Sequence, residues 1–268
     1  GLPRTSYTDR LKEFLDTGRV VVVTGARRSG KSFIMKQYLR EVVRKGRDPR
    51  ETLFVNFEDP RFVDLDTKTL QSIYTAYLQV MKPTKKPCIF LDEVQAVRGW
   101  EKWVATMQEL KKADIVVSGS NATMLSRELG TLLTGRHVDL TVFPLSFGEF
   151  LVWRRIEAGD EMSRIRHAAE IGNSLDEFIE KGAFPEIVLT GRRELLLSYF
   201  DDVLIKDIAQ RYRLRKAGKL KILAKFFLAN VASPVTFSSL EKFLAVSADS
   251  AERFAGYLEN AYMCFLLK

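Results

Sequence analysis

Cysteine, histidine and long hydrophobic runs are all scarce in this sequence. Its 268 residues include only two cysteines and two histidines. Both cysteines, Cys88 and Cys264, lie in apolar runs, so we expect buried reduced thiols rather than a disulfide, as is usual inside cells. No apolar run approaches the roughly 20 residues that a transmembrane helix needs. Residues 1–4 also lack the apolar core of a secretory signal. These absences predict a cytoplasmic protein without a membrane anchor.

The composition is that of a globular protein with an uneven distribution of charge. Apolar residues make up 46% and charged residues 28% of the chain, and its net charge is +8. Residues 1–50 hold 13 basic and 5 acidic side chains, and residues 192–225 hold 10 and 4. Such clusters either bind polyanions, namely nucleotide phosphates or nucleic acid, or form a solvated face. For residues 40–50 we favour the solvated face.

Two patterns of hydrophobicity divide the chain near residue 143. Before it, short apolar runs alternate with amphipathic stretches, which is typical of βαβ units around a parallel sheet. We expect strands at residues 19–24, 52–57, 87–92, 115–119 and 138–143. We expect the helices between them at residues 31–45, 65–81, 100–111 and 122–133. The prediction is a three-layer α/β domain with a five-stranded parallel sheet at residues 1–143.

Beyond residue 143 the strand-like runs end and helical periodicity takes over. We expect helices at residues 147–155, 174–181, 194–213 and 219–231, then a helix-turn-helix pattern at 237–244 and 250–260. Residues 263–268 would be the first strand of a wing. We therefore predict an all-helical lid at residues 144–215 and a truncated winged-helix-like domain at 216–268. The sequence also lacks an initiator methionine, so we expect a piece of a longer protein.

Residues 25–32, GARRSGKS, match the phosphate-binding pattern G-x-x-x-x-G-K-[ST] at every position. Glycines permit the sharp turn in which successive backbone N–H groups point at an anion, and the next helix adds its N-terminal amides. Lys31 should reach the β- and γ-phosphates of ATP, and the Ser32 hydroxyl should bind Mg²⁺. The residues expected around the nucleotide are Gly25, Ala26, Arg27, Arg28, Ser29, Gly30, Lys31, Ser32 and Phe33.

A pair of carboxylates, Asp92 and Glu93, follows the apolar run CIFL at residues 88–91. The carboxyl end of a parallel strand is where α/β sheets bind ligands. Asp92 should hold the Mg²⁺ shell, and Glu93 should orient or deprotonate the attacking water. Acidic residues that simply end a strand are the alternative. The position of Asp92, 61 residues after Lys31 on an expected strand, favours the catalytic role.

Several classes of nucleotide-binding enzyme lack support in the sequence. The Asn-Lys-x-Asp motif with which GTPases read guanine is absent, and so is a Leu-Ser-Gly-Gly-Gln-like signature of ABC-transporter ATPases. Small-molecule kinases usually lack both the adjacent Asp-Glu pair and a long helical C-terminal half. An ATPase with a helical output region is the class that remains.

Further phrases identify a family. They are LDEVQ at residues 91–95 with Trp100 following, GSN at 119–121, GR at 135–136, PLSFGEF at 144–150, GAFPE at 182–186 and DDVLIKDI at 201–208. With the phosphate loop, they resemble a prokaryotic family of AAA-type P-loop ATPases related to the STAND group. The resemblance covers nearly the whole chain, and the phrases after residue 100 are the specific ones.

This resemblance implies roles for four further residues. Ser120 or Asn121 would sense the γ-phosphate, although a strand-end turn or helix cap explains them almost as well. Arg136 would be an arginine finger that stabilises charge on the transferring phosphoryl group, with a surface arginine in a turn as the alternative. Pro185 would contact the base from the lid, or would simply mark a helix boundary. No lid sensor arginine can be assigned.

We therefore predict Mg²⁺-dependent binding and hydrolysis of ATP that switches the conformation of a macromolecular partner. One alternative is a DNA-binding ATPase that uses its winged helix or the basic segment 211–225; another is a nucleotide-stabilised scaffold without hydrolysis. Residues 248–253 carry two acids and one base, which suits a recognition helix poorly. Expected partners are ATP or ADP, further copies of the chain, and a DNA or protein client.

Overall fold

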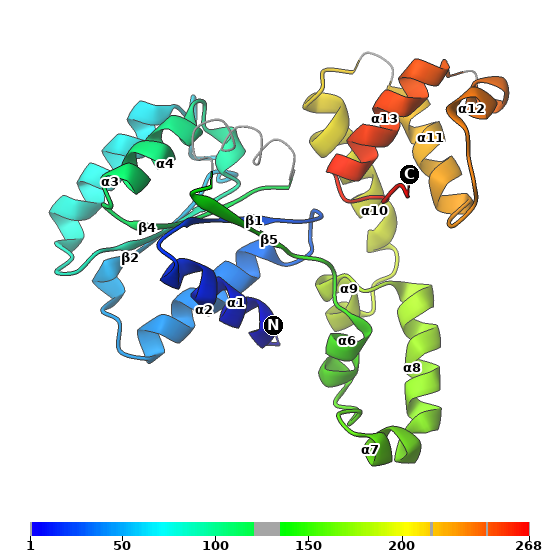
Figure 1. Cartoon of the computed structure of the whole chain (residues 1–268), viewed down its shortest axis with the longest axis horizontal. Helices are drawn as coiled ribbons and strands as arrows, with labels where there is room; N and C mark the ends of the chain where they lie inside the picture. The colour runs from blue at the N-terminus through cyan, green and yellow to red at the C-terminus, as the bar shows by residue number, and fades with distance from the viewer. Residues whose placement is uncertain (1, 121–134, 215–216, 245, 268) are drawn as a thin grey trace.

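The computed structural model describes residues 2–120, 135–214, 217–244 and 246–267. A sheet domain occupies one side of the molecule, and two groups of helices occupy the other (Figure 1). Within these ranges no helix is both long enough and apolar enough to cross a membrane. The helix expected at residues 122–133 lies outside the described residues.

Among the described residues, five parallel strands form one sheet in the order β2-β3-β4-β1-β5. They are β1 (Val20–Thr24), β2 (Thr52–Asn56), β3 (Cys88–Asp92), β4 (Asp114–Ser118) and β5 (His137–Thr141). The inner strands are runs of apolar, largely β-branched residues, as burial on both faces of a parallel sheet requires. The predicted α/β fold is confirmed, and β1, which precedes the phosphate loop, lies inside the sheet.

Helices cover both faces of this sheet. α1 (Thr5–Asp16) and α2 (Lys31–Arg44) lie on one face, while α3 (Thr67–Met81) and α4 (Trp100–Glu109) lie on the other. Alternate residues of β1 serve the two layers, because successive side chains of a strand point to opposite faces. The short helices of this domain are η1 (Pro49–Glu51) and η2 (Val94–Ala96).

Helix α1 was not predicted. Leu11 and Leu15, four residues apart, lie on the buried side of this helix and join the apolar cluster under the sheet. Full burial of one leucine side chain stabilises a fold by about 1.5–3 kcal/mol. The spacing of these two leucines, with Tyr7 and Phe14 packed against the same cluster, was the available signal.

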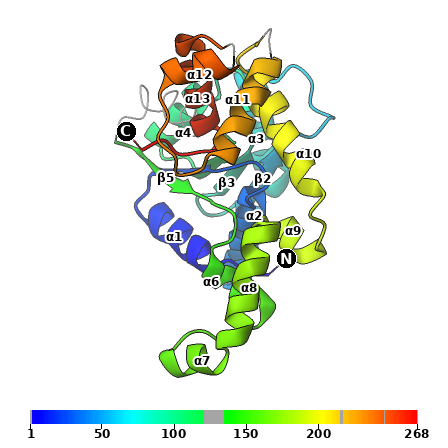
Figure 2. The same cartoon turned by 90° about the vertical axis from the view of Figure 1, so that its right-hand side faces the viewer.

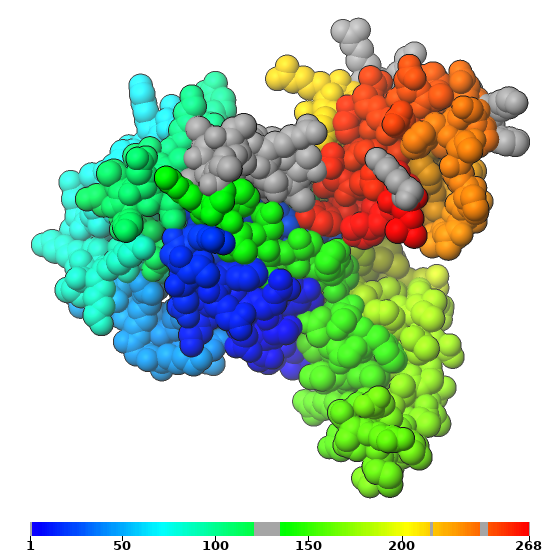
Figure 3. Space-filling model, in the orientation of Figure 1, coloured from blue at the N-terminus to red at the C-terminus, as the bar shows by residue number. Residues whose placement is uncertain are grey.

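The first helical group, here called the finger, comprises α6 (Phe147–Arg154), α7 (Glu161–Arg166), α8 (Ala168–Lys181) and α9 (Pro185–Thr190). It projects away from the sheet domain with α7 at its tip (Figures 2 and 3). Ser146 and Glu149 form a capping box at the start of α6. Phe178 of α8 packs edge-to-face against Phe147 and Phe150, which joins the two long helices.

The second helical group, here called the bundle, comprises α10 (Leu195–Asp202), the π-helix η3 (Val203–Gln210), α11 (Ala217–Ala229), α12 (Phe237–Leu244) and α13 (Ala248–Asn260). Apolar residues of η3, α11, α12 and α13 share one core. The helix expected at residues 194–213 is thus α10 followed directly by a π-helix. Residues 263–267, expected as a wing strand, are not a strand. The predicted domain boundaries and the winged helix stay predictions.

Candidate nucleotide site

The loop between β1 and α2 turns tightly at the carboxyl end of β1. Gly25 has φ +135°, and a side chain there would place its Cβ 2.0 Å from the carbonyl oxygen of Val142. Gly30, at the N-cap of α2, has φ +101°. Only glycine adopts these positive φ values without strain, and only glycine leaves room for the Val142 carbonyl oxygen beside residue 25. The loop therefore presses against the residue after β5 and delivers the start of α2 to the edge of the sheet, where helix amides bind phosphates.

Lys31 lies buried inside this loop. The side chain is 5% exposed, and its Nζ donates hydrogen bonds to the carbonyl oxygens of Gly25 at 3.0 Å and Ala26 at 3.1 Å. Burial lowers the pKa of the Lys31 ammonium, while the charges of Glu93, Asp207 and Asp92 oppose that shift. The ammonium thus lies within the field of three carboxylates, and phosphate oxygens could replace its carbonyl partners.

Asp92 ends β3 and is 1% exposed. Its carboxylate accepts a hydrogen bond from the Ser118 hydroxyl, and the Ser32 hydroxyl lies beside it. Desolvation raises the pKa of Asp92, and these two hydroxyls oppose the shift. Ser32 and Asp92 are therefore in contact and offer hard oxygen ligands. They fit Mg²⁺, which commonly takes one or two protein ligands and completes its shell with phosphates and water.

Glu93 has a left-handed backbone, with φ +55°, which is uncommon for a residue other than glycine. Its backbone N–H donates to the Ser118 hydroxyl at 3.1 Å, and its carboxylate accepts from the Gln95 amide. The side chain is 9% exposed and lines the cavity beside the loop. Strained residues of this kind concentrate at functional sites, where the surrounding structure holds them in place. Ser118 and Gln95, which hold the two carboxylates, were not predicted.

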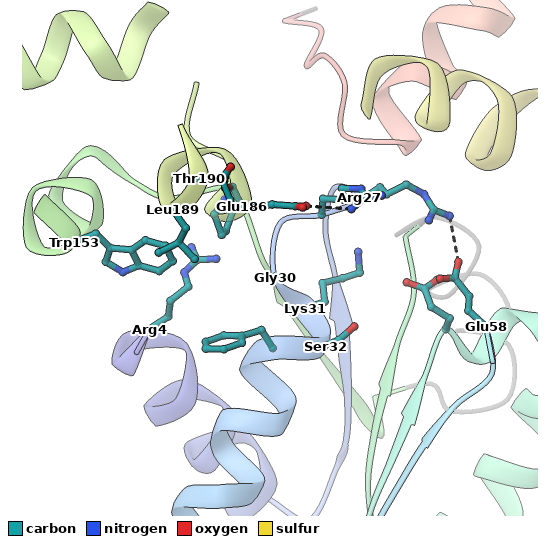
Figure 4. A pocket seen from close by; sticks show the side chains of 14 residues that line it. Arg4, Arg27, Gly30, Lys31, Ser32, Glu58, Trp153, Glu186, Leu189 and Thr190 are labelled. Carbon is teal, nitrogen blue, oxygen red and sulfur yellow. Dashed lines mark hydrogen bonds and ion pairs between the residues drawn. The ribbon is translucent and has the colours of Figure 1, made fainter. Parts of the chain in front are cut away.

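A cavity of about 520 Å³ lies between the phosphate loop and the finger (Figure 4). Lys31, Ser32 and Glu93 form its polar end. Its less polar lining residues are Phe33, Trp153, Pro185, Leu189 and Thr190. The cavity therefore offers a charged end for phosphates and a more apolar end for an aromatic base, where Arg4 and Glu186 also lie beside the apolar side chains (Figure 4).

Two arginines of the loop reach the helical half of the molecule. Arg27 forms two hydrogen bonds of 3.0 Å with the carboxylate of Asp207 in η3 and one of 3.3 Å with Glu58. Arg28 donates to Glu186 of α9 at 3.1 Å. Burial opposes the charge of Arg27, but the hydrogen bond to Asp207 and the charges of Asp207, Glu58 and Glu93 together outweigh that effect and raise the pKa of the guanidinium. The phosphate loop is thus tied to both the finger and the bundle.

Comparison with known proteins agrees with this geometry. Residues 17–151, about half of the chain, match the family model described as AAA domain. The chain belongs to this AAA domain family. Residues 172–268 match the model of a domain of unknown function. The predicted AAA-type family is therefore confirmed, whereas the relationship to STAND ATPases stays a prediction.

Curated relatives of this AAA domain protein come from a bacterium and an archaeon. An uncharacterized protein of Haemophilus influenzae is 33% identical over the whole chain, which covers 66% of that protein. The uncharacterized protein MJ1544 of Methanocaldococcus jannaschii is 28% identical over 93% of the chain and 56% of its own length. The chain thus spans less than two thirds of the length of both relatives.

Among solved structures, the Walker-type ATPase PABY2304 of Pyrococcus abyssi is similar in fold. The match covers 97% of this chain and 89% of that chain, with a TM-score of 0.60 and 14% identity. At this identity the likeness concerns the fold alone. It extends from the AAA domain through both helical groups.

The site of the AAA domain includes some predicted residues and leaves out others. Ser120, just after β4, is 2% exposed and donates to Asp207 at 3.0 Å. Pro185 lines the cavity 3.8 Å from the point where a Gly30 Cβ would lie. Asn121 lies outside the described residues. These placements leave the functional roles of Ser120 and Pro185 as predictions.

Arg136 lies away from the site of its own chain. It precedes β5, where His137 pairs with Val20 at the amino end of β1, and its side chain is exposed. The phosphate loop follows Thr24 at the other end of β1. Four residue steps of a strand separate the two ends by about 13 Å. Arg136 could therefore act as an arginine finger only in the phosphate site of a second copy of the chain.

Arg4 and Asp207 are site residues that the sequence did not identify. Arg4 is 2% exposed; its guanidinium donates to both carboxylate oxygens of Glu149, at 2.8 and 2.9 Å, and to the Ser29 carbonyl oxygen at 2.9 Å. It thus joins the phosphate loop of the AAA domain to the finger. Arg4 belongs to no local pattern, whereas Asp207 lies in the phrase DDVLIKDI at residues 201–208, for which no role in the site was predicted.

Proposed function

We propose that this AAA domain protein binds Mg²⁺-ATP and hydrolyses it. The observation that carries the proposal is the meeting of Lys31, Ser32 and Asp92 at one edge of the sheet. The ammonium of Lys31 is buried within the glycine-rich loop, and the Ser32 hydroxyl lies beside the Asp92 carboxylate and lowers its pKa. A buried cation beside a helix N-terminus and a serine–aspartate pair is what a magnesium triphosphate requires.

Each group has a defined part in binding. Lys31 exchanges its carbonyl partners for phosphate oxygens, and the backbone amides of the loop surround the same phosphates. Ser32 and Asp92 would hold Mg²⁺, which when bound neutralises charge on the phosphates. The base would occupy the apolar end of the cavity against Pro185, with Trp153 nearby.

Glu93 is the candidate that activates water. Its carboxylate borders the cavity next to Asp92, and the bond from Gln95 fixes its orientation. A carboxylate in this position can orient a water molecule in line with the terminal phosphate and accept its proton. Ser120 would detect that phosphate from the end of β4, as predicted.

The switch part of the proposal rests on the two loop arginines. Arg27 and Arg28 bind carboxylates of the bundle and the finger, so a change of charge in the phosphate loop changes the contacts of both helical groups. Movement of those groups would act on a macromolecular partner.

The test is Mg²⁺-dependent ATP turnover by the wild type, Lys31→Ala and Glu93→Gln. We expect turnover in the wild type and a loss of about 100-fold or more in both variants, because charge stabilisation and proton transfer each contribute at least that much. Lys36→Ala and Glu109→Gln, at exposed positions of α2 and α4, are the matched controls. Turnover that both site variants retain would rule out hydrolysis at this site.

Among the residues that the structure describes, no contact favours either alternative function. Lys221 of the basic segment pairs with Asp201 at 2.7 Å, and Arg215 and Lys216 lie outside the described residues. DNA that raises turnover with a steep dependence on salt would favour the DNA-binding alternative. ATP that stabilises the chain without phosphate release would favour the scaffold.

A further inference from the structure

Asp207 brings a carboxylate of the bundle into the phosphate site of the sheet domain. It is 3% exposed, and its two oxygens bind Arg27 in a two-pronged pair at 3.0 Å. One of these oxygens also accepts the Ser120 hydroxyl at 3.0 Å. A single side chain therefore joins the phosphate loop, the end of β4 and η3.

The backbone around Asp207 fastens it to the bundle. Its neighbour Ile208 is fully buried in the bundle core, together with Leu204 and Val203 of the same π-helix. A π-helix is rare, and such wide turns occur frequently at functional sites. Adjacent residues of η3 are thus anchored to different parts of the molecule, so displacement of the Asp207 carboxylate must displace the bundle or strain η3.

Asp207 competes with phosphate for the same donors. Its charge acts on the buried ammonium of Lys31, which is the group expected to hold the phosphates. A triphosphate bound there would add negative charge beside Asp207, and it would attract Arg27 and the Ser120 hydroxyl. Like charges at close range in a site of low polarity repel strongly. Nucleotide and the Asp207 contacts therefore oppose each other, which is thermodynamic coupling between two sites.

Building on the proposed function, we propose that Asp207 is a positioning residue that reports occupancy of the phosphate site to the bundle. In the structure it holds Arg27 and Ser120. When the triphosphate binds, these donors shift toward phosphate, Asp207 is released, and η3 moves with the helices packed on it. The sensor of the helical half is thus a carboxylate that phosphate displaces.

The test compares the wild type with Asp207→Asn, which keeps the shape of the side chain and removes its charge. Binding of a non-hydrolysable ATP analogue with Mg²⁺ is measured together with amide hydrogen exchange across residues 203–210. In the wild type, the analogue should speed exchange in η3. In Asp207→Asn, exchange should be fast without the analogue, and the analogue should bind at least about fivefold more tightly, because coupling of this kind is typically fivefold or more.

Two further variants sharpen the test. Asp201→Asn removes an exposed carboxylate of α10 that pairs only within the bundle, with Lys221, among the contacts described; it should behave as the wild type. Arg27→Gln breaks the same pair from the partly exposed loop side, so exchange in η3 should be fast without nucleotide even if Asp207→Asn folds poorly.

Unchanged or weaker binding by Asp207→Asn would overturn the proposal, and so would exchange in η3 that is indifferent to the analogue in the wild type. A wild type that binds no ATP analogue would overturn the proposed function and this inference together. A wild type that binds it while η3 stays unchanged would overturn the inference alone.

Discussion

Buried charge dominates the site at the scale of single residues. Asp92 and Lys31 are almost fully buried. Burial raises the pKa of Asp92 and lowers that of Lys31, so it favours the neutral form of both side chains. Such groups cost stability unless a partner compensates them. Their retention is explained if the missing compensation comes from a ligand, here the metal and the phosphates.

The first prediction concerns Asp92→Asn without nucleotide. The amide oxygen can still accept the Ser118 hydrogen bond while the cost of burying a charge disappears. We therefore expect the midpoint of thermal unfolding to rise by about 2–4 °C, the equivalent of about 1 kcal/mol. Differential scanning calorimetry measures it, with Asp176→Asn at an exposed position of α8 as control. A midpoint lower than that of the wild type would show that the Asp92 charge is already compensated by the protein.

The second prediction concerns Glu149 and pH. Burial acts to raise the pKa of Glu149, but the hydrogen bonds from Arg4 and Ser146 outweigh it and lower that pKa below 4.5. An acid with a lowered pKa in the folded state contributes stability above its unfolded pKa and loses it as the pH falls through the folded value. The free energy of unfolding of Glu149→Gln should therefore be about 2 kcal/mol lower than that of the wild type at pH 7. This difference should shrink below pH 4.5. Urea unfolding across pH measures it; a difference independent of pH would contradict the ion pair.

The sequence predicted single residues where the chemistry is local. Lys31 and Ser32 lie within eight consecutive residues, and Asp92 ends a strand with a clear apolar pattern. Arg4 and Asp207 could not be predicted in the same way, because their charged partners Glu149 and Arg27 lie 145 and 180 residues away along the chain. Only the fold brings such charges together.

At the scale of elements, the phosphate loop packs so closely against the chain after β5 that position 25 has no room for a side chain. Gly25 lies so close to Val142 that a methyl group would overlap its carbonyl oxygen. Gly18, in the turn before β1, also has a positive φ of 70° but has open space around it. Substitutions at Gly18 and Gly25 therefore separate two costs in stability: that of the backbone conformation, which both share, and that of the steric overlap, which only Gly25 has.

The third prediction is that Gly25→Ala lowers the unfolding midpoint several times more than Gly18→Ala. The Gly18 variant has only the conformational cost of about 1–2 kcal/mol, whereas Gly25→Ala must also push the loop away from the end of β5. Thermal unfolding of both variants measures the difference. Equal losses would show that the loop relaxes without resistance from β5.

The apolar periodicity of each element decides whether the sequence could predict it. The strands were recognised because they are short apolar runs, the inner ones buried on both faces of the sheet, and α2, α3 and α4 because each has one apolar side at helical spacing. The wide turn of η3 was not, because a π-helix has the same apolar residues as the α-helix that was expected at 194–213. Its geometry is set by the demand that Ile208 and Asp207 reach different parts of the molecule.

At the scale of the whole molecule, the exposed position of Arg136 separates two modes of action. A single chain places this residue at the amino end of β5, away from its own phosphate loop. An arginine finger can act from a neighbouring subunit, where it raises turnover by about 10³ to 10⁵. Turnover should then rise more steeply than linearly with protein concentration.

The fourth prediction follows from that arrangement. Arg136→Ala should lose turnover while its affinity for ATP stays unchanged, and mixing it with Lys31→Ala should restore part of the activity, because each variant supplies what the other lacks. Steady-state turnover of the mixture measures this. A linear dependence on concentration with no gain on mixing would indicate a switch that works as a single chain.

The most direct measurement for the whole molecule is calorimetric titration of ATP into the wild type and Lys31→Ala with Mg²⁺ present. We predict one ATP bound per chain in the wild type and an affinity at least tenfold lower in Lys31→Ala, since the ammonium supplies a charge-assisted contact of about 1.5–3 kcal/mol. Removal of Mg²⁺ should weaken wild-type binding as well. Absence of binding, or binding that Lys31→Ala leaves unchanged, would contradict a phosphate site at this loop.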